Sequence, residues 1–134
     1  MVQNTSHQFL IFVLFVLMST IGHAQRFYNH SGQLVMSVSG QTYYDNSGSI
    51  ITRYRNNTFY NQSGSQIATI RSDNLYKNGR RIGYIQNNRI YSSNGSQIGR
   101  YSGNRLYNQR GQLVGRISGS FDVEMILFIY FIYF

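Results

Sequence analysis

Arginine is the residue type with the greatest chemical potential in this chain of 134 residues. Eleven of the twelve basic residues are arginines, and all twelve lie between residues 25 and 119, where only two acidic residues occur. This segment therefore carries a net charge of +10. Because a guanidinium group pairs with two oxygens of a phosphate or carboxylate at once, the segment is suited to anionic ligands.

Seven arginines are candidate anion-binding residues because their spacing places them on one face of the predicted strands, together with a series of tyrosines. They are Arg53, Arg55, Arg71, Arg100, Arg116, Arg89 and Arg105. A second interpretation is that arginine packs over tyrosine across neighbouring strands, with some cation–π character, while the net charge provides solubility. The sequence favours neither interpretation over the other.

Groups suited to catalysis or metal binding are scarce. The chain has no cysteine, and His30 is the only histidine after residue 24. Two of the four carboxylates, Asp45 and Asp73, fall in predicted turns, and Asp122 and Glu124 share one face of a predicted strand without a third ligand. General acid–base catalysis and metal binding need more positioned groups than this. We therefore expect no enzyme activity, no catalytic residues, no metal and no cofactor.

The chain repeats a unit of about 16 residues six times. Glycines recur at spacings of 16, 16, 15, 16 and 16, each with a tyrosine four residues earlier, or three residues earlier in the fourth unit. Tandem units of one length indicate one supersecondary motif that buries its apolar face against its neighbours. The repeat positions are Tyr28, Tyr44, Tyr60, Tyr76, Tyr91, Tyr107, Gly32, Gly48, Gly64, Gly79, Gly95 and Gly111.

Each unit contains two turn signals. A loop such as Asn29–Gly32 opens on Asn, Asp or Ser and closes on glycine, except for the shorter Lys77–Gly79 loop. The second signal is a two-residue pair of mostly Gly, Asn and Asp, typical of tight hairpins. These pairs are Gly40-Gln41, Asn56-Asn57, Ser72-Asp73, Asn87-Asn88 and Gly103-Asn104.

Two-residue turns fix which residues face each other across each predicted hairpin. Apolar residues then pair with apolar residues, as in Val38 with Tyr43, Tyr54 with Phe59, Ile70 with Leu75, Ile85 with Ile90 and Tyr101 with Leu106. The same registers place Arg53 opposite Tyr60 and Arg100 opposite Tyr107. We predict about twelve short strands in an all-β fold, six hairpin units closed into a shallow, barrel-like ring that hides the sheet edges.

The two ends of the chain differ from the repeats. Residues 1–24 resemble a secretory signal, with an apolar run from Phe9 to Met18 and small residues before a predicted cut between Ala24 and Gln25. This predicts a periplasmic, cell-surface or secreted protein. Residues 120–134 form a hydrophobic segment, interpreted as a plug for the ring, a tail that dips into a membrane, or a non-native end. Its β-branched and aromatic composition disfavours a helix.

The unit Tyr107-Asn-Gln-Arg-Gly-Gln-Leu-Val-Gly-Arg-Ile117 resembles the repeats of the bacterial beta-flower proteins. The resemblance covers residues 25–119. It implies a small exported chain whose hairpin petals surround a shallow barrel with an apolar centre, and a distant similarity to Tubby C-terminal and scramblase-like barrels. Family members have four or five petals, whereas this chain has six units, so the terminal units either form separate petals or share one. The resemblance implies no established activity.

Taken together, the sequence predicts an exported, non-enzymatic binding module for anionic lipid head groups or acidic glycans, associated with membrane surfaces and with no nucleic acid as partner. The alternative is a structural surface or periplasmic protein that has no small ligand and self-associates through its apolar C-terminus. Removing residues 120–134 distinguishes two roles of this segment. A plug is needed for folding, whereas a dipping tail is needed only for membrane affinity.

Overall fold

A computed structural model describes residues 24–134. The predicted secretory segment therefore lies, apart from Ala24, outside the described residues. Twelve strands are followed by a short helix that continues as a turn of π-helix. The elements are β1 Gln25–Asn29, β2 Leu34–Ser39, β3 Thr42–Asp45, β4 Ile50–Arg55, β5 Thr58–Tyr60, β6 Gln66–Arg71, β7 Asn74–Lys77, β8 Arg80–Gln86, β9 Arg89–Ser92, β10 Gln97–Ser102, β11 Arg105–Asn108, β12 Leu113–Ser118, α2 Val123–Phe128 and η1 Ile129–Tyr133.

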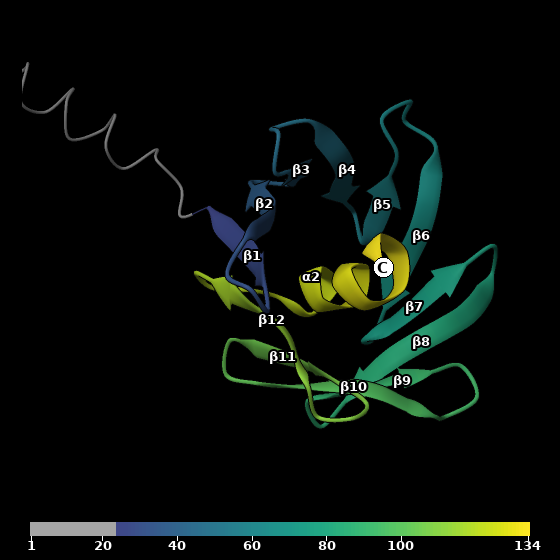
Figure 1. Cartoon of the computed structure of the whole chain (residues 1–134). Helices are drawn as coiled ribbons and strands as arrows, with labels where there is room; N and C mark the ends of the chain where they lie inside the picture. Colours follow the sequence, from purple (N-terminus) through teal and green to yellow (C-terminus); the bar gives the residue numbers. More distant parts are fainter. Residues whose placement is uncertain (1–23) are drawn as a thin grey trace, which may run out of the picture.

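The strands form a closed antiparallel barrel in which each strand pairs with its neighbours in the chain and β12 pairs with β1 (Figure 1). Closure leaves no unpaired edge within the described residues. The predicted all-β ring of hairpin repeats is confirmed.

The two-residue turns adopt the conformations that their sequences predict. Asn56 and Asn57 both have positive φ, at 50° and 59°, as a type I′ turn requires. Gly40, with φ 60°, is instead followed by a residue without positive φ, the pattern of a type II′ turn. The predicted registers are confirmed in all five tight hairpins, including Tyr54 opposite Phe59.

The glycine loops at the opposite end are held by the residue that opens them. The Asn29 side-chain oxygen accepts hydrogen bonds from the backbone N–H groups of Ser31 and Gln33, each at 3.0 Å. Gly32 closes the loop at φ 80° and donates its N–H to the Asn29 carbonyl oxygen. In the four loops that open on Asn or Asp, this side-chain oxygen thus accepts hydrogen bonds from backbone N–H groups of the loop.

The first and last strands together form a sixth petal. Ile117 lies opposite Phe27 and Arg116 lies opposite Tyr28, in the same register as Tyr101–Leu106 and Arg100–Tyr107 in the covalent hairpin β10–β11. Gly119 follows β12 with φ 87°, where the other petals have their tight turn. The ring therefore has six petals, and the terminal units share one of them.

The C-terminal segment runs through the middle of the ring (Figure 1). All residues of Met125–Ile129 are at most 1% exposed and belong to the same hydrophobic cluster as the inward side chains of the strands. Of the three interpretations of residues 120–134, this arrangement corresponds to the plug. The expectation that the segment would not be helical was wrong, because helix propensities differ by less than about 0.7 kcal/mol per residue, less than the gain from burying such side chains.

The plug also corrects the placement of the two acidic residues that precede it. Asp122 is the N-cap residue of α2, and Glu124 lies in the first helical turn. They were predicted on one strand face, but the strands end at Ser118, and the chain turns inward at Gly119. Both carboxyl groups consequently lie where the helix enters the barrel.

Small residues on the inner face make room for the plug. A Cβ atom added to Gly83 would lie 2.0 Å from the ring of Phe131, and one added to Gly99 would lie 2.5 Å from the ring of Tyr130. Gly115 is crowded instead by the neighbouring strand, through the Tyr28 carbonyl oxygen and the Phe27 ring. Gly83 and Gly99 are therefore small because rings of the plug occupy the space of the missing side chains, and Gly115 because the backbone of β1 approaches closely.

Candidate anion-binding face

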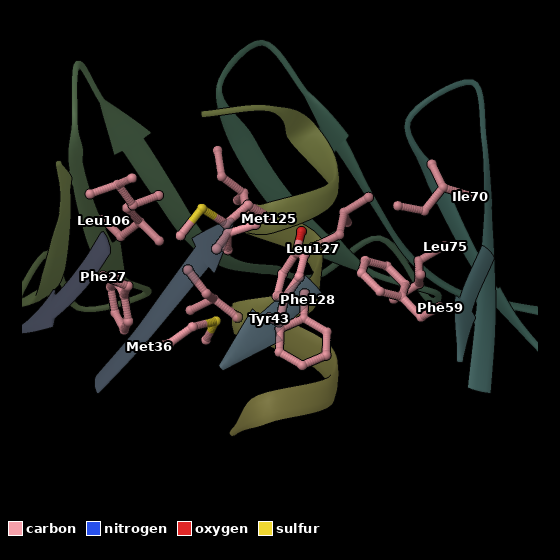
Figure 2. Close-up of a cluster of buried hydrophobic side chains, with 14 of the residues drawn as sticks. Phe27, Met36, Tyr43, Phe59, Ile70, Leu75, Leu106, Met125, Leu127 and Phe128 are labelled. Atoms are coloured by element: carbon pink, nitrogen blue, oxygen red, sulfur yellow. The ribbon is translucent and has the colours of Figure 1, made fainter. Parts of the chain in front are cut away.

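The structure decides which face of the sheet lines the barrel. The inner face carries the apolar partners, among them Phe27, Met36, Phe59 and Leu106, which surround Phe128 and its neighbours on α2 (Figure 2). Because side chains alternate along a strand, the repeat tyrosines and the candidate arginines lie on the outer face. The registers of Arg100 with Tyr107, Arg116 with Tyr28 and Arg53 with Tyr60 place the two series on the same face, and all seven arginines are exposed.

Four of the seven candidate arginines stack on tyrosine rings of their own petals. The guanidinium carbon of Arg100 lies 4.2 Å from the centre of the Tyr107 ring, and that of Arg71 lies 4.4 Å from the Tyr76 ring. The corresponding distances are 4.8 Å for Arg55 over Tyr60 and 5.9 Å for Arg116 over Tyr28. The rings hold the guanidinium groups against the wall of the barrel while leaving them exposed.

Two pairs of arginines lie directly opposite each other on adjacent strands. Arg89 of β9 pairs with Arg100 of β10, and Arg105 of β11 pairs with Arg116 of β12. Like charges in directly opposed positions of a sheet are unfavourable unless another group neutralises them. We call these four arginines, on four consecutive strands, the arginine face.

The other three candidates lie apart from this face. Arg53 and Arg55 are on β4 and Arg71 is on β6, and strand β5 separates the two. Arg53 is flanked by uncharged residues, with Thr42 opposite on one side and Tyr60 on the other. The predicted candidates are thus brought together only in part, because strands that carry no candidate arginine separate β4 and β6 from each other and from β9–β12.

A pocket of about 370 Å³ opens at the mouth of the barrel where α2 enters. It is lined by Gln25, Val38, Gly40, Gln41, Tyr43, Tyr54, Asp122, Glu124 and Met125. Sequence reasoning missed this pocket. The sequence offered one indication of it, the pair of acidic residues Asp122 and Glu124 just after the last strand. Their role in the pocket could be recognised only from the structure, because they line it as part of the helix α2.

The charge of this mouth pocket is reflected in the pKa values of its residues. Burial raises the pKa of Glu124, and the nearby Asp122 carboxyl raises it further. Burial, with Glu124 second in effect, raises the pKa of Tyr54 to about 12 and that of Tyr43 further. The pocket therefore disfavours additional negative charge.

The opposite mouth is more apolar. A cavity of about 700 Å³ is lined there by residues of the glycine loops, including His30, and by the end of the plug at Tyr133 and Phe134. Residues 24–134 contain no cluster of three potential metal ligands, around His30 or elsewhere. Within the same residues, no helix has the length and apolar character needed to cross a membrane.

Comparisons with known proteins give one match. A family model described as 4-fold beta flower protein matches residues 57–126, which is just over half of the chain. The matched segment contains the eight strands β5 to β12 and the first four residues of α2. Neither curated proteins nor solved structures gave a match.

Proposed function

This chain belongs to the family of 4-fold beta flower proteins, and from this premise we propose that it is an exported, non-enzymatic module that binds anionic lipid head groups through its arginine face. Acidic glycans present similar anionic oxygen atoms, so the test includes an acidic polysaccharide. Family membership accounts for the repeat barrel, and the outer surface of this barrel carries the proposed binding site.

The observation that carries the proposal is the opposition of Arg89 to Arg100 and of Arg105 to Arg116. A sheet that needed only solubility would be more stable with the charges dispersed. Phosphate groups placed between opposed guanidinium groups would turn this repulsion into charge-assisted hydrogen bonds.

Tyrosines next to the arginine face support a membrane surface as the source of the phosphate. Tyr107 and Tyr28 lie under Arg100 and Arg116. Tyr91 follows Arg89 by two residues on the same face of β9, and its ring stacks on that of Tyr84 with 5.1 Å between their centres. Tyrosine combines an apolar ring with a polar hydroxyl and suits the interface between lipid and water.

Export is part of the proposal because it determines which anions the protein meets. The apolar run from Phe9 to Met18 and the small residues before Gln25 support it. Outside the cytoplasm, anionic lipids and acidic polysaccharides are available, whereas nucleic acid is not an expected partner. The scarcity of catalytic groups supports binding rather than enzymatic chemistry.

The test is co-sedimentation of the protein, purified after expression of the full chain, with vesicles of neutral or anionic lipid at low and high salt. We expect pelleting with anionic vesicles only and release by salt, since salt screens exposed charges. Replacing Arg100 and Arg116 by glutamine should weaken binding about 30-fold, because each basic residue near an anionic surface contributes about 1 kcal/mol.

The matched control replaces Arg80 and Arg110, which are exposed and lie outside the arginine face, so that the net charge falls equally. Equal weakening by both double variants would mean that net charge alone drives binding. Binding to an acidic polysaccharide but not to vesicles would identify a glycan as the ligand. A folded protein that binds neither anion supports the structural alternative.

That alternative, a structural protein that self-associates through its apolar C-terminus, has little exposed surface to use. Among the large apolar residues of the plug, only Tyr133 and Phe134 are exposed, at 38% and 69%. These two residues therefore define the surface that an oligomerisation measurement should examine if the arginine face binds no anion.

A further inference from the structure

The sixth petal lacks the turn that closes the other five. In its place, Gly119 at the end of β12 lies beside the start of β1: a Cβ atom added to Gly119 would be 3.4 Å from the Ala24 carbonyl oxygen and 3.7 Å from the Gln25 Cα atom. The end of β12 and the start of β1 are therefore in contact, but no turn joins them, and this leaves a gap in the sixth petal. The seam is held by strand pairing from Arg26–Ser118 to Asn29–Gly115 and by the contacts of Phe27 with Gly115 and of Arg116 with Tyr28.

The mouth pocket opens at this same seam. Gln25 lines it together with the two carboxyl groups of Asp122 and Glu124, and no basic side chain lines it. Tyr43, which is 2% exposed, lines the same pocket. The pocket thus gathers two carboxyl groups without a basic partner, a set of acceptors suited to a cationic hydrogen-bond donor.

We infer that this donor is the α-ammonium group of Gln25, created when the peptide bond between Ala24 and Gln25 is hydrolysed. Water adds across the bond, so that Ala24 leaves with a new carboxylate and Gln25 keeps the amino group, which takes up a proton at neutral pH. The group has three N–H donors. It ties β1 to the start of α2, across the gap where the sixth petal has no turn.

The inference rests on the export proposed above, because it needs the cut at this bond. Before the cut, Gln25 offers one neutral N–H group, and the carboxyl groups of Asp122 and Glu124 lie next to each other in a pocket that no basic side chain lines. After the cut, a positive charge lies at the edge of the same pocket. Processing and closure of the barrel are then coupled, since the mature chain has an ion pair that the precursor lacks.

The first measurement is the intact mass of protein expressed as the full chain in a host with a working secretory pathway. A mass equal to residues 25–134 with a free amino group is expected. A mass lower by one ammonia means that Gln25 has cyclised to an uncharged lactam, which overturns the inference. An uncleaved chain contradicts the export proposal as well, whereas cleavage at another bond contradicts only the inference.

The second measurement titrates the α-amino group directly. Reductive methylation with ¹³C-formaldehyde keeps amines charged and gives two signals, because Lys77 is the only lysine. Besides Asp122 and Glu124, the titratable groups lining the pocket are Tyr43 and Tyr54, which stay neutral in this pH range because their pKa values are raised. We expect an α-amino pKa about one unit above the ordinary range of about 7.7–8.0.

Variants separate this ion pair from a general structural role. Glu124→Gln and Asp122→Asn should each return the α-amino pKa toward its ordinary range while leaving the Lys77 signal unchanged. Asp45→Asn is the matched control: it removes one carboxylate from a loop where other units use asparagine, as at Asn29 and Asn61. An α-amino pKa that is ordinary, or that responds equally to Asp45→Asn, overturns the inference.

Discussion

The hydroxyl of Tyr130 donates a hydrogen bond to the backbone carbonyl oxygen of Tyr107, with 2.6 Å between the two oxygens. Tyr130 belongs to the central plug and Tyr107 to strand β11 in the barrel wall. The ring reaches the wall because Gly99 has no side chain there: an added Cβ would lie 2.5 Å from the Tyr130 ring. This contact joins the plug to the repeat at a defined position.

Tyr130→Phe removes this hydrogen bond and keeps the ring. We expect the free energy of unfolding to fall by about 1 kcal/mol, the net contribution of a typical hydrogen bond. Urea denaturation monitored by circular dichroism measures the change. Tyr133→Phe is the control, because Tyr133 is exposed and should change stability by less than about 0.5 kcal/mol. Equal effects would mean that the contact contributes nothing specific.

Gly83→Ala tests the close approach between the plug and the wall. The added methyl group would lie 2.0 Å from Phe131, so we expect a loss of about 1–3 kcal/mol in the free energy of unfolding. The double variant with Phe131→Leu should recover part of that loss, because the smaller side chain leaves space. Strictly additive effects of the two substitutions would contradict direct contact.

Leu127→Ala tests the plug as a core element. Leu127 is completely buried, so the substitution should lower the free energy of unfolding by about 2–5 kcal/mol. Deletion of residues 120–134 should abolish cooperative thermal unfolding, because it leaves the inner faces of the strands exposed to water. Phe134→Ala, at the 69% exposed end, should have a much smaller effect. A deletion variant that still unfolds cooperatively would rule out an essential plug.

Ser72→Asn should stabilise the protein. Ser72 has φ 50°, a left-handed conformation that costs an ordinary residue about 1–2 kcal/mol and asparagine less. Asn56 and Asn87 occupy the same turn position in other petals. We expect the midpoint of urea denaturation to rise for Ser72→Asn and to stay unchanged for Ser93→Asn, a loop serine without positive φ. A decrease for Ser72→Asn would show that the serine has another role.

Stability should decrease above about pH 10, because burial raises the pKa of Tyr43 above the usual value for tyrosine, with Glu124 adding to the effect. The folded state then keeps a proton that the unfolded chain loses, so rising pH favours unfolding. The same argument applies to Tyr54, whose pKa is about 12. Urea denaturation at several alkaline pH values should show a smaller decrease for Tyr43→Phe. A parallel decrease in both proteins would contradict this origin.

Local sequence was sufficient to predict the hairpins. Turn pairs such as Asn56-Asn57 fix the conformation of the connection between two strands. Because side chains alternate between the two faces of a strand, the turn then fixes which residues lie opposite each other, such as Tyr54 and Phe59. Both signals act between residues close in the chain, and closing the ring follows from the need to hide strand edges. The placement of tyrosines and arginines on one face followed from the same alternation.

Three properties depended on more than the local turn signals. The inner face was decided by the plug, and Met125–Ile129 became helical because burial outweighs a small propensity cost. The bulged registers across two glycine loops decided that Arg89 lies opposite Arg100 and that Arg105 lies opposite Arg116, whereas Arg53 lies opposite Thr42. The pocket at the seam exists only because both ends of the chain meet there. The sequence alone determined the repeating hairpin, whereas the tertiary structure decided what fills its centre and which charges gather on its surface.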